Sequence, residues 1–232
     1  MSGRYSLISK KEKLEVRFNV EFKKDLLAAY NVAPTKLMPV ITSGKEKGIS
    51  WFYWGITPDM AKNKSVSHKL YSASDKDLTE KFSFKKALSE RRCIIPADGY
   101  YEWKKLGKKS QIPYRVIRYD NEPFSFAGIW DEYEADNGEM VHTFRIITTN
   151  SNDDISEISN SMPVIFNKDQ EKIWLDPDST TDELIDLLKA PEEELLSFYS
   201  IAPLINSPNS DGPALIEPAP PVDQNGNYTL FQ

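Results

Sequence analysis

Short stretches in which hydrophobic and polar residues alternate dominate the chain, and such alternation is typical of β-strands. Prolines and glycines punctuate these stretches and keep them short. The pattern predicts strands over residues 36–42, 49–54, 93–103 (interrupted at 96–99), 113–119, 123–130, 142–149 and 162–166. Strands outnumber helical segments and do not alternate with them. We therefore expect an α+β fold of a single domain, with a mainly antiparallel, barrel-like β-sheet and short flanking helices.

Helical signals are few and short. Ser9 and Glu12 have the spacing of a capping box, which predicts a helix that begins at this point. Thr180 and Glu183 form a second box of the same kind, and it predicts the start of another helix. The helical segments expected after the first are residues 83–91, 168–174 and 180–189.

Two regions lack a clear pattern. Residues 57–80 are polar, lysine-rich and weakly periodic, so we expect a loop there. The end of the chain is rich in proline, asparagine and glycine. We expect the domain to span residues 1–218 and an irregular tail to follow over 219–232.

Composition excludes several classes of protein. One cysteine excludes a disulfide framework, and one cysteine with two histidines cannot fill a four-ligand Cys/His zinc site. No metal or cofactor is therefore expected. No apolar run reaches the roughly 18–20 residues of a membrane span, and the N-terminus lacks the apolar core of a signal peptide. We expect a cytoplasmic protein that does not bind membranes.

The net charge of -6 hides a strong division along the chain. Residues 1–59 carry a net charge of +4, residues 60–118 one of +9, and residues 119–232 one of -19. If the first half of the chain forms one face, that face is basic and suits phosphate contacts; the alternative is a solvated lysine-rich surface. The candidate residues are Lys62, Lys64, Lys69, Lys85, Lys86, Arg91, Arg92, Lys104, Lys105, Lys108 and Lys109.

Glu102 is the most promising residue for chemistry. It follows a turn at residues 96–99, and Tyr101 and Trp103 flank it. If these rings hold it in an apolar pocket, desolvation raises its pKa and suits acid/base catalysis. The rings could also stack on bases. The alternative is an exposed glutamate on an alternating strand.

The other reactive residue types are few. His142 lies in a strand pattern and is interpreted as a surface residue. His68 could meet a phosphate, although a plain loop residue is the simpler interpretation. Cys93 has apolar neighbours and is interpreted as a buried packing residue. The chain contains no G-x-S-x-G elbow, P-loop or G-x-G-x-x-G motif.

A series of short segments spans nearly the whole chain. They are Gly3-Arg4-Tyr5, Tyr30-Asn31-Val32-Ala33-Pro34, Trp54-Gly55-Ile56-Thr57-Pro58, residues 95–103, Gly128-Ile129-Trp130, Ile147-Thr148-Thr149-Asn150, Met162-Pro163-Val164 and residues 203–218. In their order and spacing they resemble the SOS response-associated peptidase family, the abasic-site processing proteins.

This resemblance implies a defined chemistry. Members of the family bind single-stranded DNA at abasic sites and usually expose Cys at position 2 after removal of Met1. The α-amine, whose pKa is near 7.7–8.0, attacks the sugar aldehyde to give a Schiff base. The thiol then closes a thiazolidine ring, while a glutamate shuttles protons and a histidine assists. The implied partners are single-stranded DNA and abasic-site DNA. The resemblance also implies a monomer that is associated with the nucleoid when it is bound to DNA.

The resemblance carries over to individual residues. The catalytic positions are Ser2, Glu102 and Ser159, of which only Glu102 keeps the family's residue type. The DNA-binding positions are Arg4, Asn31, Pro34, Ser72, Ser74, Tyr101, Trp103, Lys85 and Arg91. Ser72 and Ser74 stand where the family has the outer residues of an Asn-Ala-Arg segment, and the tryptophan pair often found after the W-G-x-x-P segment is absent.

These departures weaken the chemistry. The amine of Ser2 can form an imine, but its hydroxyl is a poor nucleophile, and an oxazolidine reopens more readily than a thiazolidine. A retained Met1 would block imine formation at Ser2. Loss of the histidine removes a positioned acid/base group, a change that typically costs about 10²–10⁴ in rate.

Three functions stay open at this point. The first is an abasic-site enzyme that forms and reverses a covalent link or cleaves its own N-terminus. The second is a degenerate relative that binds single-stranded or damaged DNA without a lasting bond. The third is an interaction protein that has lost DNA binding and uses its acidic second half as a partner surface.

Overall fold

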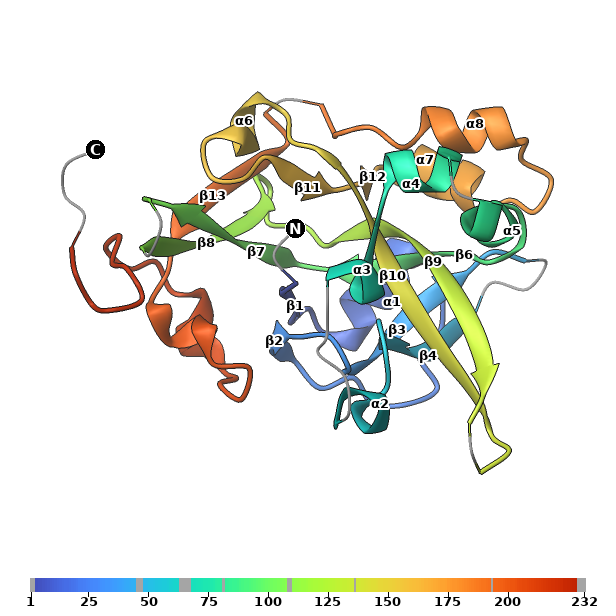
Figure 1. Ribbon diagram of the computed structural model, residues 1–232, viewed down its shortest axis with the longest axis horizontal. Coiled ribbons are helices and arrows are strands. Elements are labelled where there is room, and N and C mark those ends of the chain that lie inside the picture. Colours follow the sequence, from blue (N-terminus) through green and yellow to red (C-terminus); the bar gives the residue numbers. More distant parts are fainter. Residues whose placement is uncertain are drawn as a thin grey trace.

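Two β-sheets organise the chain (Figure 1). The computed structural model describes residues 3–44, 48–62, 68–80, 82–107, 110–135, 137–192 and 194–228. The smaller sheet is antiparallel throughout and has the strand order β13 (Leu196–Ser200), β8 (Gln111–Arg118), β7 (Gly99–Lys105), β1 (Tyr5–Leu7) and β2 (Ala29–Val32). The short strand β1 is therefore an inner strand with partners on both sides.

The larger sheet closes into a barrel. Its order is β11 (Ser161–Pro163), β10 (Met140–Asn150), β4 (Ile49–Trp54), β3 (Leu37–Thr42), β6 (Arg92–Ala97), β9 (Phe124–Glu134) and β12 (Ile165–Phe166). Because β9 also pairs with β10, the five strands from β10 through β9 form a closed ring. Most pairings are antiparallel, and β4 pairs parallel with β10. The expected α+β, barrel-like fold is confirmed.

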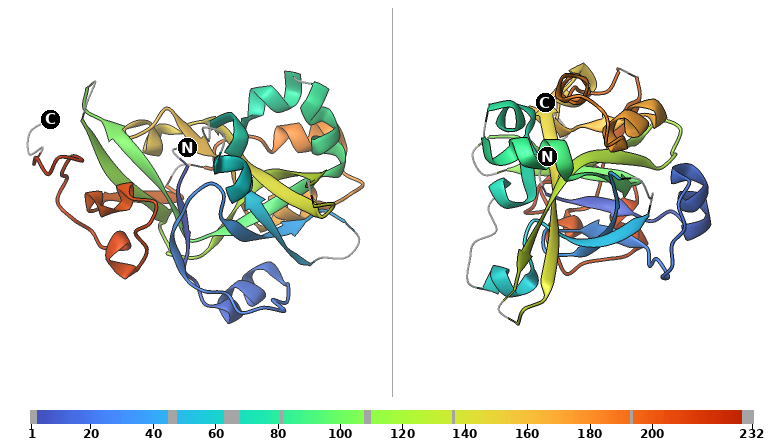
Figure 2. Two further views of the ribbon diagram at one scale, coloured as in Figure 1. Left: turned by 60° about the horizontal axis from the view of Figure 1, so that its bottom comes forward. Right: turned by 90° about the vertical axis from the view of Figure 1, so that its right-hand side faces the viewer.

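Short helices cover the sheets. They are α1 (Lys11–Phe18), α2 (Pro58–Lys62), α3 (His68–Tyr71), α4 (Asp75–Glu80), α5 (Phe82–Glu90), α6 (Asp153–Ser156), α7 (Lys168–Leu175) and α8 (Thr181–Asp186), with 3₁₀ turns at Pro203–Asn206 and Pro213–Ile216. The helices α4, α5, α7 and α8 gather at one end of the barrel, while β7 and β8 extend towards the other end (Figures 1 and 2).

Long-range contacts overturn two local predictions. The region 57–80 is not a loop, because the structure describes helices there and a strand, β5 (Ser72–Ser74), that pairs parallel with β10. The capping box at Ser9 is absent. The hydroxyl of Ser9 bonds to the carboxylate of Asp98 instead, and α1 begins at Lys11 after an N-cap at Lys10. The box at Thr180 is confirmed.

Aromatic rings fill the core between the sheets. The ring of Tyr5 on β1 meets Trp54 at 5.1 Å and Phe126 at 5.7 Å between centroids, both edge to face. All three side chains are buried. This packing fixes β1 against the barrel and so sets where the start of the chain lies.

The described part of the tail packs against the smaller sheet. The amide of Ala219 donates to the carbonyl of Ser200, and the hydroxyl of Ser110 donates to the carboxylate of Asp223. The amide of Gln111 donates to the side-chain oxygen of Gln224 over 2.9 Å. The segment is irregular, as expected, and the boundary at residue 218 stays a prediction.

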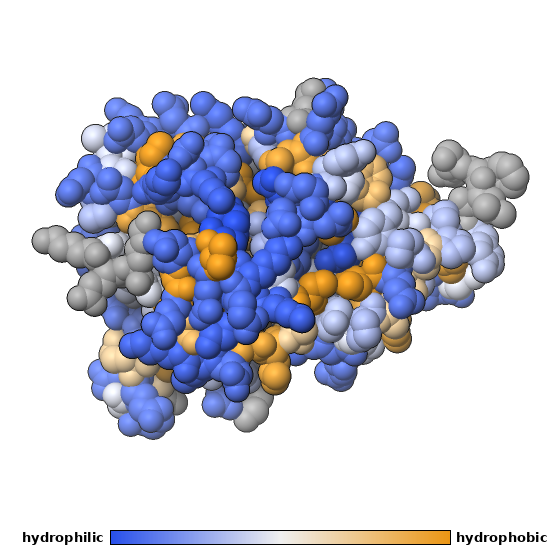
Figure 3. Space-filling view, turned by 180° about the vertical axis from the view of Figure 1, so that it is seen from behind, coloured by the Kyte–Doolittle hydropathy of each residue, from blue (hydrophilic) through white to orange (hydrophobic). Residues whose placement is uncertain are grey.

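The surface is mostly hydrophilic on the face opposite to that of Figure 1. Hydrophobic residues form small patches there, separated by hydrophilic ones (Figure 3). Within the described residues, no helix has both the length and the apolar character required to cross a bilayer.

Candidate functional site

The first strand brings the start of the chain beside β7, the strand that carries Glu102. β1 pairs antiparallel with β7, and beyond the strand the amide of Tyr101 donates to the carbonyl of Arg4 over 3.1 Å. This bond places Arg4 beside Tyr101, the neighbour of Glu102 on β7. The position of the chain's start beside the carboxyl group of Glu102 stays a prediction, because residues 1 and 2 lie outside the described residues.

Tyr71, at the end of α3, packs against two glycines. A Cβ atom added at Gly3 would lie 3.0 Å from the phenol oxygen of Tyr71, and one added at Gly55 would lie 3.0 Å from its Cβ. Both glycines have positive φ, 77° and 83°. The indole nitrogen of Trp54 donates to the carbonyl of Tyr71 over 2.8 Å. The phenol is therefore held against the backbone of residue 3.

A pocket of about 590 Å³ opens at this point. Its walls come from the end of α3, from β7 and from the segment between α6 and β11, which are far apart in the sequence. The lining residues are Tyr71, Glu102, Trp103, Lys104, Lys105 and residues 156–161. A volume in this range is typical of pockets that bind a small molecule or a single nucleotide unit.

Glu102 is deeply buried in this wall. Its side chain is only 1% exposed, which confirms the expected enclosed glutamate and excludes an exposed one on an alternating strand. Removing a carboxylate from water is costly unless other groups compensate, so its neighbours matter. Tyr71 and Tyr100 both interact with it electrostatically.

Arg4, Tyr71 and Glu102 influence one another. Burial raises the pKa of the Tyr71 phenol; the cation of Arg4 opposes this shift and the carboxylate of Glu102 adds to it. Burial lowers the pKa of the Arg4 guanidinium, and the Tyr71 phenol offsets part of that change. At neutral pH the cluster therefore contains a protonated phenol between a cation and a carboxyl group.

A second hollow, of about 480 Å³, lies on the other side of Trp103. Trp103 and Lys105 line both hollows. The remaining lining residues of the second are Arg4, Gln111, Asn206 and Gln224. The indole nitrogen of Trp103 donates to the side-chain oxygen of Asn206 over 2.7 Å, which fixes the ring between the two spaces.

The three serines at substituted family positions have different surroundings. Ser72 is 4% exposed on β5. The hydroxyl of Ser74 accepts the amide of Asp77 over 3.0 Å at the start of α4. The hydroxyl of Ser159 donates to the carbonyl of Ser161 over 2.8 Å, and of the three serines it is Ser159 that lines the pocket with Glu102.

Tyr101 cannot stack on a base. Its side chain is fully buried, and its hydroxyl donates to the carbonyl of Tyr30. The stacking expected of Tyr101 is therefore wrong, because Ile201, Ile205 and Leu215 from the C-terminal segment cover its ring. Trp103 is half-buried and keeps an accessible ring at the two hollows.

Asn31 and Pro34 do not line either hollow. Asn31 is fully buried, and its amide donates to the carbonyls of Ser207 at 2.9 Å and Ser210 at 3.0 Å. It thereby holds the loop that carries Asn206. Pro34 lies half-buried in the turn between β2 and β3. The direct DNA contact expected of Asn31 is replaced by a supporting role.

The predicted basic face is divided. Lys104 and Lys105 line the pocket, whereas α5, with Lys85 and its neighbour Lys86, lies at the other end of the molecule (Figures 1 and 2). Arg91 pairs with Asp131 and Glu132. Arg92 is 1% exposed, so its expected place on a basic surface is wrong. Lys64, Lys108 and Lys109 lie outside the described residues, as do the side chains of Lys62 and His68.

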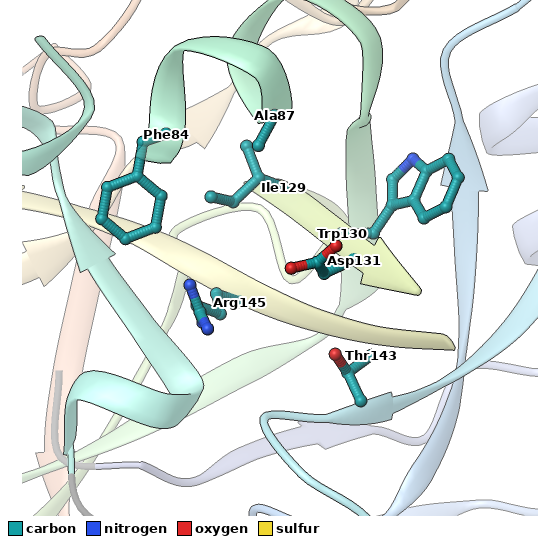
Figure 4. Close-up of a pocket in the computed structure, with 7 residues that line it drawn as sticks. All are labelled: Phe84, Ala87, Ile129, Trp130, Asp131, Thr143 and Arg145. Atoms are coloured by element: carbon teal, nitrogen blue, oxygen red, sulfur yellow. The ribbon is translucent and has the colours of Figure 1, made fainter. Parts of the chain in front are cut away.

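A third hollow lies under α5 (Figure 4). At about 20 Å³ it is too small for a nucleotide. The guanidinium of Arg145 lies 5.5 Å from the centre of the Phe84 ring, a cation–π contact that attaches α5 to β10. We interpret this region as packing between helix and sheet.

The other reactive residues have structural surroundings. His142 is a partly exposed residue of β10 that stacks on Phe52, as its strand pattern indicates. Cys93 is fully buried, and burial raises the pKa of its thiol. Both interpretations are confirmed.

Sequence reasoning missed part of the site. Ser2 and Met1 lie outside the described residues, so the expected nucleophile stays a prediction. The sequence predicts a loop at Tyr71 and an irregular tail at Gln224, and it gives no signal for the contact that Asn206 makes. A signal for Tyr71 was present, because Gly3 and Gly55 lie in family segments, but only the structure shows that a single ring contacts both.

Comparisons with known proteins agree with this arrangement. Residues 1–208 match the family described as SOS response associated peptidase (SRAP). The chain is 36% identical over 222 residues to "Abasic site processing protein YoqW" of Bacillus subtilis (strain 168), covering 94% of this chain and 99% of the relative. It is 26% identical to "Abasic site processing protein HMCES" of Mus musculus, covering 82% of this chain and 65% of the relative.

Solved structures support the same relationship. A protein from Bacteroides thetaiotaomicron superposes with a TM-score of 0.81 at 29% identity, covering 93% of this chain and 99% of that one. The matches extend over both sheets, the pocket and the start of the chain. The chain belongs to the SOS response associated peptidase (SRAP) family.

Proposed function

We propose that this chain is an abasic-site processing protein that binds single-stranded DNA and forms a covalent link to the damaged sugar through the amine of Ser2, after removal of Met1. Its named relatives support the class of substrate. The observation that carries the proposal is that the Tyr71 ring lies against Gly3, one residue after Ser2, and lines the same pocket as the buried Glu102.

In this mechanism Glu102 moves protons. Its carboxylate takes a proton from the α-ammonium group of Ser2 and leaves a neutral amine, which attacks the aldehyde carbon of the open-chain sugar. The pocket holds the abasic sugar, which has no base to accommodate. Arg4, Lys104 and Lys105 bind flanking phosphates, and Trp103 stacks on a neighbouring base.

The substitutions attenuate the reaction. Ser2 offers a hydroxyl where the family usually has a thiol, so the imine closes into a ring that reopens readily. Ser159 donates its hydroxyl to a backbone carbonyl and cannot replace an imidazole as an acid/base group. We expect a slower and more reversible link than one formed through cysteine.

A second candidate function is binding without a covalent step. The hydroxyl of Ser74 caps a helix and that of Ser159 bonds to Ser161, so two substituted positions serve internal structure. The pocket, the basic residues around it and Trp103 would still suit single-stranded DNA.

Chemical trapping tests the proposal. The purified protein is incubated with single-stranded DNA carrying one abasic site, with and without borohydride, which reduces an imine to a stable amine, and is then run on a denaturing gel. Mass spectrometry of the same sample establishes whether Met1 has been removed. We expect a slow-migrating band that is stronger with borohydride. No band from protein that lacks Met1 would leave only non-covalent binding.

Glu102→Gln checks the role of the carboxylate. We expect this variant to lose the trapped band, a decrease of at least about 10²-fold in rate, while salt-sensitive DNA binding stays nearly intact. Glu157→Gln is the matched control, because Glu157 lines the same pocket but is exposed. Equal loss of binding and trapping in Glu102→Gln would show that Glu102 is structural.

A further inference from the structure

The substituted site has a carboxylate but lacks the family's histidine. Ser159 occupies the histidine position, and an aliphatic hydroxyl does not exchange protons readily at neutral pH. Imine formation needs such an exchange, because the oxygen of the aldehyde leaves as water only after it has been protonated. Another residue of the pocket must then supply the proton.

Tyr71 has the right position for this task. Its phenol oxygen lies 3.0 Å from the place that a Cβ atom of residue 3 would occupy, next in sequence to the expected nucleophile. The same side chain lines the pocket together with Glu102 and Ser159. Two glycines with positive φ leave space for the ring, and a bond from Trp54 to its carbonyl fixes its backbone. The phenol is therefore preorganised beside the reaction site.

The charges around Tyr71 suit a donor. Arg4, on the segment before β1, and Glu102, on β7, are the charged groups that act on the phenol in the described part of the chain. Burial raises the pKa of the phenol, so it is protonated at neutral pH. A phenolate formed by proton transfer would be stabilised by the nearby cation of Arg4.

We propose that Tyr71 is a catalytic residue of this chain, the proton donor that takes the place of the family's histidine. The inference rests on the proposed imine chemistry. The amine of Ser2 forms a C–N bond to the aldehyde carbon, and the oxygen takes up the proton that Glu102 removed from the ammonium group. The Glu102 carboxylate, free again, takes a second proton from the nitrogen, which restores the nitrogen lone pair, and later releases this proton to solvent. Tyr71 donates a proton to the hydroxyl, which leaves as water while that lone pair forms the C=N bond. The iminium loses its remaining N–H proton to the phenolate, which restores Tyr71.

Tyr71→Phe removes the hydroxyl and keeps the ring. We expect the single-turnover rate of borohydride trapping to fall by about 10²-fold, with the Kd for abasic DNA and the melting temperature nearly unchanged. Tyr133→Phe is the matched control, because Tyr133 is also half-buried but lies on β9 outside the pocket. That variant should trap DNA at the wild-type rate.

Tyr71→His separates proton donation from packing. An imidazole can donate a proton, so trapping should recover at least about 10-fold relative to Tyr71→Phe, and its rate should fall as pH rises through the imidazole pKa of about 6.5. If the ring only packs, Phe is the better replacement and His the worse one. If Tyr71→Phe traps DNA at the wild-type rate, or if Tyr71→His traps it more slowly than Tyr71→Phe does, this inference is wrong and the proposed function stays intact. Absence of trapping in wild-type protein would overturn both.

Discussion

Arg91 and Arg92 are neighbours in the sequence but differ in burial and in the groups that they contact. Arg91 forms ion pairs at the surface with Asp131 and Glu132. Arg92 is buried and satisfies the backbone at the ends of two helices. Its guanidinium donates, over 2.6–2.7 Å, to the carbonyls of Leu88 and Ser89 in the last turn of α5 and of Trp174 and Asp176 around the end of α7. Helix ends leave such carbonyls without partners, and a cation is favoured there.

Arg92→Leu should therefore destabilise the protein strongly. We expect the free energy of unfolding to fall by about 3 kcal/mol or more, because four carbonyls, two of them in buried bonds, lose a charged donor. Arg91→Leu should cost less than about 1 kcal/mol, since the carboxylates that it pairs with are partly exposed. Urea denaturation of both variants measures the difference. Similar losses in the two would show that Arg92 is not essential to the helix ends.

At the residue scale, the burial of the candidate catalytic residue Glu102 was easier to predict than the burial of Arg92. The aromatic neighbours of Glu102 indicated an apolar wall, and its burial is confirmed. The burial of Arg92 could not be read from the sequence. Alternation shows that Arg91 and Arg92 point to opposite faces, but which face is inside depends also on the end of α7, more than eighty residues away along the chain.

Among the elements, local signals succeeded where no tertiary contact competed with them. The box at Thr180 and Glu183 lies on an exposed helix start and is confirmed. Ser9 has the same spacing, but Asp98 accepts its hydroxyl and backbone amide. The strand β5 pairs with β10, some seventy residues later, and three residues are too short to show a period of their own. Tyr71 was missed for the same reason.

The loop over 205–210 depends on one buried side chain. We expect Asn31→Ala to lower the free energy of unfolding by about 1–3 kcal/mol and to speed protease cleavage within this loop, because the carbonyls of Ser207 and Ser210 lose their donor. Binding of DNA should weaken as well, since the same loop holds Asn206 against Trp103.

Limited proteolysis and a denaturation curve measure this effect. Asn137→Ala, in the exposed turn between β9 and β10, is the control and should change neither quantity. A loop that resists protease as well in Asn31→Ala as in the wild type would mean that other contacts hold it.

For the whole molecule, we expect DNA binding to depend more on where the lysines lie than on the net charge. The net charge is -6, yet Lys104 and Lys105 line the pocket while Lys85 and Lys86 lie on α5 at the other end. We expect Lys104→Ala with Lys105→Ala to reduce the slope of log K against log salt for single-stranded DNA by about 1–1.5.

The same double change at Lys85 and Lys86 is the matched control. It removes an equal charge from exposed positions, so the slope should stay within about 0.3 of the wild-type value. Salt titration of a gel shift gives both slopes. Equal reductions would show that DNA binds over both ends of the molecule.

The fold class was predictable, but the order in which the strands pair to close the barrel was not. Alternating segments indicated an antiparallel sheet, and the barrel-like expectation is confirmed. The inner position of β1 and the ring from β10 through β9 depend on pairs far apart in the chain, which periodicity does not reveal. The site lies where strands that are far apart in the sequence pair with one another. Its residues could therefore be predicted individually, but their arrangement in space could not.

The inner position of β1 also affects what happens during synthesis. Its partner β7 is made about a hundred residues later, which at about 5–20 residues per second leaves the emerging amino end without that neighbour for roughly 5–20 s. Enzymes that trim nascent chains act within such an interval. Once β7 has paired and Tyr71 rests on residue 3, that end is crowded. We therefore expect any removal of Met1 to take place on the ribosome, before the pocket exists.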